Sequence, residues 1–182
     1  MTSLPDRRQI VSALVDEAAR AYPTARVGAL AVEPETLRDF FLSLLARGPD
    51  APGQDADDLA PSAIDEVLGY GPIQSLMTDP GVTDILINGW DAIVYEKGGR
   101  LTPFAGAFFG PEHLVAFVHR HVARAERAIN RANPWVDVEL PDGSRMHAVA
   151  PPVAMGGPFV SIRRFPARPY TLADLERMGG VT

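Results

Sequence analysis

The stretch PWVDVELPDGSRMHAVAPPV, from Pro134 to Val153, contains two short runs in which apolar and polar residues alternate. In the first run, Asp137 and Glu139 alternate with apolar residues, and the second run follows the same rule. Successive side chains of a strand point to opposite faces, so each run predicts a strand with one apolar face. Pro141-Asp142-Gly143 between them is typical of a tight turn. We therefore predict an antiparallel hairpin with one charged face.

Further strands are expected on both sides of this hairpin in the sequence. Val82–Asn88 and Ile93–Glu96 are rich in β-forming residues, and Asn88-Gly89 is a strong turn signal. Lys97-Gly98-Gly99-Arg100 predicts a second hairpin, whose last strand begins at Leu101. Phe159–Phe165 predicts a later strand, in which Arg163 and Arg164 must face opposite ways. The sheet is therefore expected to be antiparallel and connected by short turns.

Helical spacing of apolar residues predicts helices before and within this sheet region. We expect three helices that form a small bundle, at about Pro5–Ala21, Pro34–Gly48 and Pro61–Leu68. The acidic segment GPDAPGQDADD, Gly48–Asp58, is interpreted as a linker. A fourth helix is expected at Pro111–Arg131, and Thr171 is expected to cap a helix in TLADLERMGG. Together these elements predict an α+β fold.

Four arginines recur along the predicted fourth helix. Arg120, Arg124, Arg127 and Arg131 are spaced by four, three and four residues, which places them on one helix face. Such a face is either a rail for an anion or a set of solvated charges, and both readings stay open.

Composition and charge limit the possible classes of protein. The chain has 182 residues, no cysteine and a formal net charge of -6. From Lys97 onward, however, it contains eleven basic and seven acidic residues. That half could face an anion or simply be solvated. A basic stripe interleaved with aromatic residues is missing, so no nucleic-acid binding is expected. With no signal peptide and no membrane span in the sequence, we expect a cytoplasmic chain.

The usual catalytic motifs are absent from the sequence. There is no G-x-S-x-G, no H-E-x-x-H and no phosphate-binding G-x-x-x-x-G-K-[ST]. His119 and His121 point to opposite sides of a helix, and His113 has no acidic partner at ligand spacing, so no metal site is expected. Asp137 and Glu139 share a strand face, which suits either acid/base chemistry or a solvated face.

Three phrases in order carry a family resemblance: DEVLGYGPIQSLMTDPGVTDILING (Asp65–Gly89), INRANPWVDVELPDGSRMHAVAPPVA (Ile129–Ala154) and VSIRRFPARPYTLADLERMG (Val160–Gly179). Together they resemble the N-terminal domain of type II/type IV secretion ATPases. The likeness is greatest to the CpaF/TadA branch of tight-adherence (Flp) pilus assembly. It covers about two-thirds of the chain.

The resemblance implies a domain plan. Residues 1–60 would be a helical N-terminal extension with an acidic linker, and residues 61–182 a PAS-like domain with an antiparallel sheet backed by helices. In that family this domain packs on a RecA-like motor domain, and six subunits form a ring. ATP and Mg²⁺ would be the cofactors of the full-length parent, with none bound tightly by this chain. The RecA-like domain and its P-loop are absent here, so this chain alone is expected to be inactive.

The resemblance also implies which residues meet the nucleotide. In such ATPases, arginines of the N-terminal domain approach the phosphates, to which a guanidinium offers paired donors. The matching motifs place Arg145, Arg163 and Arg164 in this role, with Arg127 next, and one of Arg163 and Arg164 is expected to pair within the domain instead. Glu139 stands where the family usually has arginine.

The resemblance implies partners as well. They are the chain's own RecA-like motor domain, neighbouring subunits of a hexamer and inner-membrane secretion platform proteins, which would hold a cytoplasmic protein at the membrane without a span of its own. The alternative is a stand-alone PAS-like module for ligand sensing or protein interaction. The missing P-loop fits both hypotheses.

Overall fold

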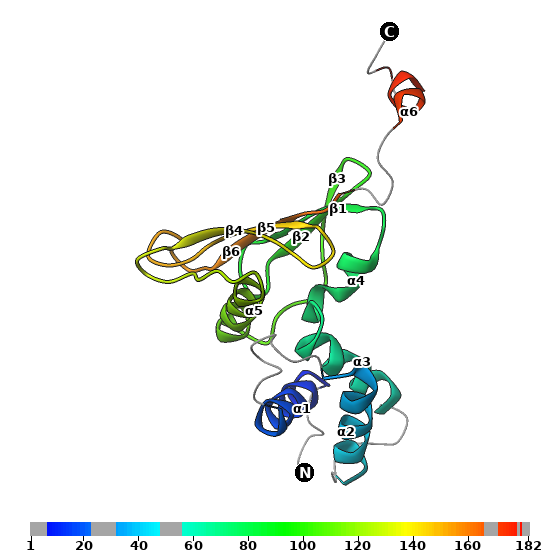
Figure 1. The fold of residues 1–182 in the computed structure, drawn as a ribbon, viewed down its shortest axis with the longest axis vertical. Helices are drawn as coiled ribbons and strands as arrows, with labels where there is room; N and C mark the ends of the chain where they lie inside the picture. Colours follow the sequence, from blue (N-terminus) through cyan, green and yellow to red (C-terminus); the bar gives the residue numbers. More distant parts are fainter. Residues whose placement is uncertain (1–6, 23–31, 48–55, 166–170, 178, 180–182) are drawn as a thin grey trace.

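The computed structural model describes residues 7–22, 32–47, 56–165, 171–177 and 179. These residues form a helical unit, a sheet unit above it in Figure 1, and a short final helix, α6 (Leu172–Arg177), which stands apart. Thr171 and Asp174 exchange hydrogen bonds at the start of α6, which confirms the predicted cap.

The helical unit consists of α1 (Arg7–Ala21), α2 (Pro34–Arg47) and α3 (Ala56–Val67). The apolar stripes of the three helices meet in one core, in which Leu14, Leu37 and Phe41 are each no more than 5% exposed. α1 and α2 lie where the sequence predicts them, within the described residues. The unit is therefore held by packing of its own side chains.

The third helix begins earlier than predicted. The sequence reading starts it at Pro61, whereas α3 begins at Ala56 and carries Pro61 inside it. Leu59 and Ala60, which precede the proline, are both 1% exposed in the core of the helical unit. Burial of this extra turn outweighs the helix-ending tendency of proline. Residues 48–55 of the predicted linker lie outside the described residues.

The sheet unit begins with a helical segment that the sequence reading missed, a 3-10 turn η2 (Gly71–Ile73) followed by α4 (Gln74–Thr78). Ile73, Leu76 and Met77 from this segment are buried in the core of the sheet unit. Both pieces are shorter than two helical turns, so their apolar periodicity is too brief to recognise.

Six antiparallel strands make one sheet, in the order β3-β2-β1-β6-β5-β4. Their bounds are β1 (Val82–Ile87), β2 (Ile93–Lys97), β3 (Arg100–Pro103), β4 (Trp135–Glu139), β5 (Arg145–Val149) and β6 (Phe159–Arg163). The hairpins β1–β2, β2–β3 and β4–β5 are those predicted from the turn residues. The α+β class is confirmed.

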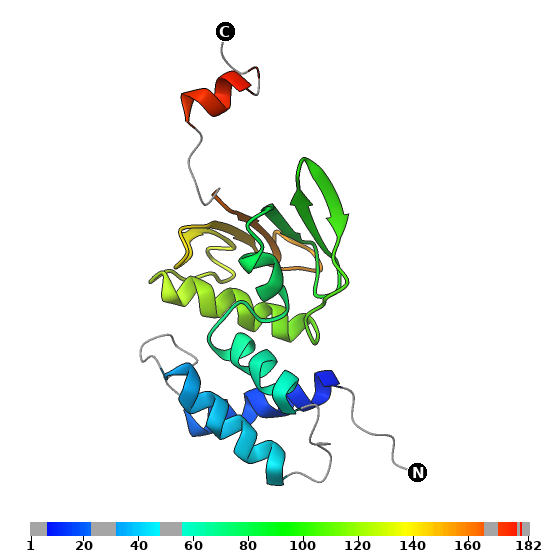
Figure 2. The same ribbon diagram turned by 90° about the vertical axis from the view of Figure 1, so that its right-hand side faces the viewer.

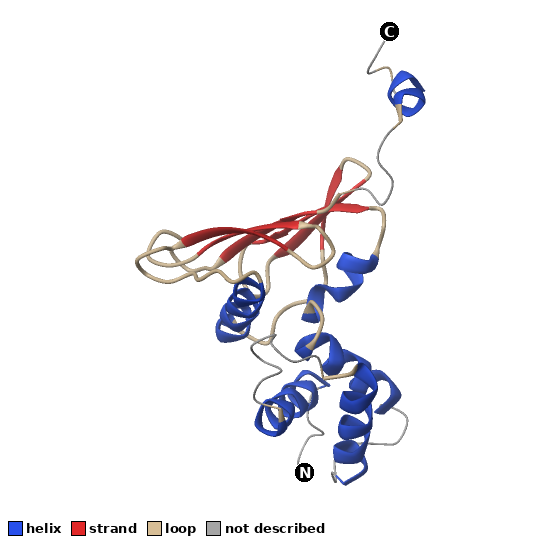
Figure 3. Cartoon of the chain, viewed as in Figure 1, coloured by secondary structure: helices blue, strands red, loops and turns tan. Residues whose placement is uncertain are grey.

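Helices cover one face of this sheet, as Figures 1, 2 and 3 show. α5 (Pro111–Arg124) runs across that face, and Leu114, Phe117 and Val118 on it are at most 2% exposed. Ile85 and Met146 on the strands are completely buried in the same core. We call this the covered face and the opposite one the open face. No helix among the described residues packs on the open face in these views.

The four-arginine face predicted on the fourth helix is not formed. α5 ends at Arg124, because Glu126 adopts a left-handed φ of 55° and the Arg127 N–H returns to the Val122 carbonyl. Arg127 and Arg131 therefore lie beyond the helix. The prediction that all four arginines share one helix face is therefore wrong.

The other two arginines of that set join the two units. Arg120 donates to the carbonyls of Glu66 and Gly69, and Arg124 donates to those of Leu68 and Val67. The last carbonyls of a helix have no partner within it, and the helix dipole favours a cation there. Arg120 and Arg124 thus cap the end of α3, so neither is a solvated surface charge.

His121 on α5 is buried against Tyr70, in the segment that follows α3. It is 2% exposed and stacks on Tyr70 with ring centroids 5.1 Å apart, and neither ring nitrogen has a hydrogen-bond partner among the described residues. Burial, with Arg120 and Arg124 nearby, lowers the pKa of His121 to about 3. The folded protein therefore requires a neutral ring.

This requirement predicts a loss of stability in acid. The unfolded ring has a pKa of about 6.5, so below that value the unfolded chain binds the proton that the folded chain excludes. Above about pH 6.5 the ring is neutral in both states, and stability should not depend on it. Between pH 7 and pH 5, proton binding by the unfolded ring should lower the free energy of unfolding by about 2 kcal/mol. Urea titrations at several pH values measure this slope. His121→Phe should remove that part of the slope; equal slopes in both proteins would contradict the assignment.

Candidate anion-binding face

Two arginines meet at one end of the open face. Arg145 on β5 lies directly opposite Arg163 on β6. The same rung of the sheet continues to Glu139 on β4 and to Asp84 on β1. Directly opposite side chains in an antiparallel pair have Cβ atoms about 4.5–5.5 Å apart. We call Glu139, Arg145, Arg163 and Asp84 the arginine row.

Both guanidinium groups of this row are exposed in the part of the chain that the structure describes. Arg145 and Arg163 are exposed, and neither side chain makes a hydrogen bond or ion pair with any other described residue. Like charges directly opposite each other destabilise a sheet. A hollow of about 240 Å³ lies beside Arg145 and is also lined by Asp137, Glu139 and Phe165. An exposed guanidinium beside this hollow, with a second one directly opposite it on the neighbouring strand, is an arrangement that an anion would stabilise.

The neighbouring rung of the open face carries more polar groups. His147 on β5 lies opposite Asp137 on β4 and opposite Ser161 on β6. His147 Nδ1 is 3.1 Å from Asp137 Oδ1. We call these three residues the histidine row. Asp137 and Glu139 share a strand face, as the alternation predicts, but Asp137 pairs with a histidine in the structure.

The hairpin turn fixes the position of Arg145. Asp142 accepts hydrogen bonds from the Ser144 N–H and hydroxyl, and Gly143 takes a φ of 80° that suits glycine. Tyr70 donates its hydroxyl to Asp142. Burial, together with the Asp142 carboxylate, raises the pKa of Tyr70 to about 12, so this hydroxyl keeps its proton. The turn is thus attached to the segment that follows α3.

The other two predicted site residues lie away from the arginine pair. Arg164 points to the opposite side from Arg163, and its guanidinium donates to the carbonyls of Leu76, Asp79 and Val82. It holds the end of α4 to the start of β1. Arg127 lies three residues beyond α5, which packs on the covered face. The structure therefore brings Arg145 and Arg163 together and leaves the other two elsewhere.

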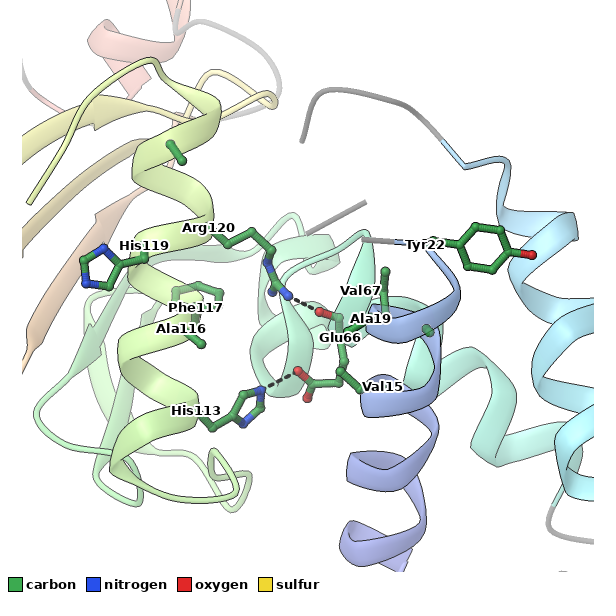
Figure 4. A pocket seen from close by; sticks show the side chains of 12 residues that line it. Val15, Ala19, Tyr22, Glu66, Val67, His113, Ala116, Phe117, His119 and Arg120 are labelled. Atoms are coloured by element: carbon green, nitrogen blue, oxygen red, sulfur yellow. Dashed lines mark hydrogen bonds and ion pairs between the residues drawn. The ribbon is translucent and has the colours of Figure 1, made fainter. Parts of the chain in front are cut away.

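A separate cavity of about 390 Å³ lies between α1 and α5 (Figure 4). His113 and Arg120 of α5 both point at Glu66 of α3, whereas His119 points to the other side of α5. His113 Nε2 is 2.8 Å from a Glu66 carboxylate oxygen, and Glu66 is 4% exposed. This acidic partner of His113 could not be recognised from local spacing, because the two residues lie 47 positions apart in the sequence.

Among the described residues, no group of three or more histidine, aspartate or glutamate side chains is arranged to hold a metal ion. In the same part of the chain, no helix is both long and apolar enough to cross a membrane.

Comparison with curated proteins finds relatives in bacteria and archaea. A provisionally named conjugal transfer protein, found in two strains of Mycobacterium tuberculosis, is 30% identical over 122 residues, which is 64% of this chain and 35% of the relative. An uncharacterized protein of Methanocaldococcus jannaschii is 26% identical over 115 residues, 62% of this chain and 16% of its own length. The chain thus spans about a third of the mycobacterial relatives. No family model matches it.

A solved structure shares the fold. The VirB11 ATPase of the Brucella suis type IV secretion system, crystallised in complex with sulphate, superposes with a TM-score of 0.54 at 24% sequence identity. The match covers 60% of this chain and 33% of that one. At this identity, the similarity establishes a common fold for the matched part.

Arg163, the last residue of β6, and Arg164, which follows it, have different contacts, so different costs are expected for removing each. Arg164→Met should lower the free energy of unfolding by about 2–4 kcal/mol, because it leaves buried carbonyls without a donor. Arg163→Met should change it by less than about 0.5 kcal/mol, or raise it, since an unpaired like charge is lost. Chemical denaturation of both variants provides the measurement. Similar losses in the two variants would show that Arg163 has a structural partner as well.

Proposed function

We propose that this chain is the N-terminal regulatory and assembly region of a secretion or pilus-assembly ATPase, and that its open face meets the nucleotide held by a motor domain. The observation that carries the proposal is the pair of exposed guanidinium groups at Arg145 and Arg163, neither of which has a side-chain partner among the described residues. The shared fold with part of the VirB11 ATPase and the conjugal transfer relatives support the same class of protein. The order of the quoted motifs favours the CpaF/TadA branch and a PAS-like description of the sheet domain.

The chemistry of the arginine pair fits a phosphate group. A guanidinium stays charged and presents two parallel N–H donors to phosphate oxygens. Arg145 and Arg163 extend from neighbouring strands, so they can hold one phosphate from two sides. Stabilisation of charge that develops on a transferring phosphoryl group is the role that positioned arginines serve in such reactions. Arg164, with its three backbone acceptors, is not proposed as a phosphate ligand.

The rest of the machinery would come from outside this chain. The chain has no G-x-x-x-x-G-K-[ST] loop, and its described residues have no cluster for Mg²⁺. In the proposal, a RecA-like motor domain binds ATP and Mg²⁺, and the arginine pair completes the pocket. Six subunits would form a ring in the cytoplasm, attached to inner-membrane platform proteins.

The helical unit would then serve assembly. Arg120 and Arg124 attach its last helix to the sheet unit through four backbone carbonyls, so the two units are positioned together. A ring contact made by α1 or α2 would therefore be transmitted to the sheet through α3.

Joining the chain to a motor domain tests this division of labour. The chain alone should show no ATP turnover, and a fusion to a P-loop motor of the same family should hydrolyse ATP. In that fusion, Arg145→Ala and Arg163→Ala should each lower kcat about a hundredfold, the usual scale for a preorganised charge at the reacting group. Arg100→Ala, which removes an equal charge from the edge strand β3, serves as the control.

Two outcomes would overturn the proposal. One is metal-dependent ATP turnover by the purified chain without a motor. The other is full turnover by the Arg145→Ala and Arg163→Ala fusions.

A second candidate function, a stand-alone PAS-like ligand-sensing module, has the cavity between α1 and α5 in its favour. Its volume of about 390 Å³ is within the range of small-molecule pockets, and apolar side chains such as Val15 and Phe117 line it. Ala116 on α5 also lines it, so Ala116→Trp should fill the space. If the module senses an apolar ligand, a fluorescent apolar probe should bind the wild type and not this variant. Equal binding, or none, would remove this alternative.

A further inference from the structure

Four hydrogen-bonding side chains form a compact block on the open face. Arg145 and His147 lie two residues apart on β5, and Ser161 and Arg163 lie two residues apart on β6. The strands pair in register, so Arg145 faces Arg163 and His147 faces Ser161. Residues two apart on a strand are about 6.6–6.8 Å apart along it. The block therefore occupies an area that one or two phosphate groups can cover.

Asp137 sets the protonation of the histidine in this block. An ionised carboxylate only accepts hydrogen bonds, so His147 Nδ1 must carry the proton that is shared with Asp137 Oδ1, 3.1 Å away. In a neutral ring, Nε2 is then an acceptor and offers nothing to an anion. Only the imidazolium form has a second N–H to donate.

Charged groups surround His147 on the open face. Asp137 on β4 lies directly opposite it, and the adjacent arginine row adds Glu139, Arg145, Arg163 and Asp84. Three carboxylates and two guanidiniums leave one net negative charge while the face is empty. A dianion bound between the arginines would make the surroundings of His147 more negative, which favours the imidazolium.

We propose that Arg145, Arg163, His147 and Ser161 together form a binding site for a doubly charged oxyanion, a phosphate group or its analogue, and that His147 takes up one proton when the anion binds. This proposal rests on the proposed function of the arginine pair. It adds His147 and Ser161 as ligands of the anion, and the uptake of a proton by His147. Ser161 contributes its hydroxyl, which has no hydrogen-bond partner among the described residues and can rotate toward the anion. Asp137 is a positioning residue, because it acts through His147.

Inorganic sulfate is the appropriate probe, since it stays a dianion throughout the range in which histidine titrates. Titration of the chain with sulfate, followed by ¹⁵N NMR of the histidine rings, reports affinity and protonation of His147 in one experiment. Affinity should rise about tenfold from about pH 8 to pH 6, as one charge-assisted hydrogen bond is added. Saturating sulfate at about pH 7 should shift the His147 ring toward the imidazolium signature.

Variants separate the contributions of the block. His147→Gln retains a donor that does not titrate, so binding should persist with little dependence on pH. Ser161→Ala should weaken binding a few-fold at every pH, roughly the effect of one neutral hydrogen bond. Ser75→Ala and Arg100→Ala remove the same groups from exposed positions elsewhere and should leave binding unchanged.

The outcomes distinguish this inference from the function on which it rests. Sulfate binding that needs both arginines but shows the same pH dependence in wild type and His147→Gln would overturn the histidine role and leave the arginine pair standing. Binding unaffected by Arg145→Ala and Arg163→Ala, or no binding at all, would overturn the oxyanion site altogether. Activity of the motor fusion that depends on the arginines would then still support the proposed function.

Discussion

The register of six antiparallel strands is the constraint on which the other features depend. Side chains alternate between faces, so the register that buries Met146 and Ile162 against α5 also places Arg145 opposite Arg163 on the open face. A slip of one residue in β5 would exchange the faces and bury Arg145. Apolar packing on the covered face therefore determines the positions of charges that it does not touch.

The end of α3 is where the helical unit is joined to the sheet unit. Arg120 and Arg124 are both half-buried and satisfy carbonyls that the helix itself cannot. Glu66 is buried at the same place, with His113 as its partner. Buried charges are costly unless they are paired or hydrogen-bonded, and here each has a partner within reach. The junction of the two units is thus polar and specific, whereas each unit has its own apolar core.

Local patterns predicted what depends on neighbours in the sequence. The alternation in β4 and β5 and the turn residues gave correct hairpins, and the opposite orientations of Arg163 and Arg164 follow from a period of two. Contacts between distant residues could not be predicted in this way. Arg120 has the same spacing as a solvated arginine, and only the approach of α3, more than 50 residues away in the sequence, gives it a partner. The end of α5 depends on one left-handed residue, Glu126. Glycine usually occupies such a position, so the sequence does not indicate that the helix ends there.

The energetic balance of the open face favours an anion as its complement. Opposed like charges cost about 0.2–1 kcal/mol per pair, a small but persistent penalty for a marginally stable domain. Asp84 and Glu139 at the two ends of the arginine row reduce that penalty without pairing with either guanidinium.

A bound phosphate would offset this repulsion. Each charge-assisted hydrogen bond to a phosphate stabilises the complex by about 1.5–3 kcal/mol, which is several times the repulsion between the two arginines. An apolar partner would instead have to desolvate both cations, which costs far more than their mutual repulsion. At the other end of the same face an apolar contact is favourable, because Trp135 on β4 is 61% exposed and shares its rung with Val149 on β5 and Phe159 on β6. A partner that complements the whole face would therefore bring an anion to one end and apolar side chains to the other.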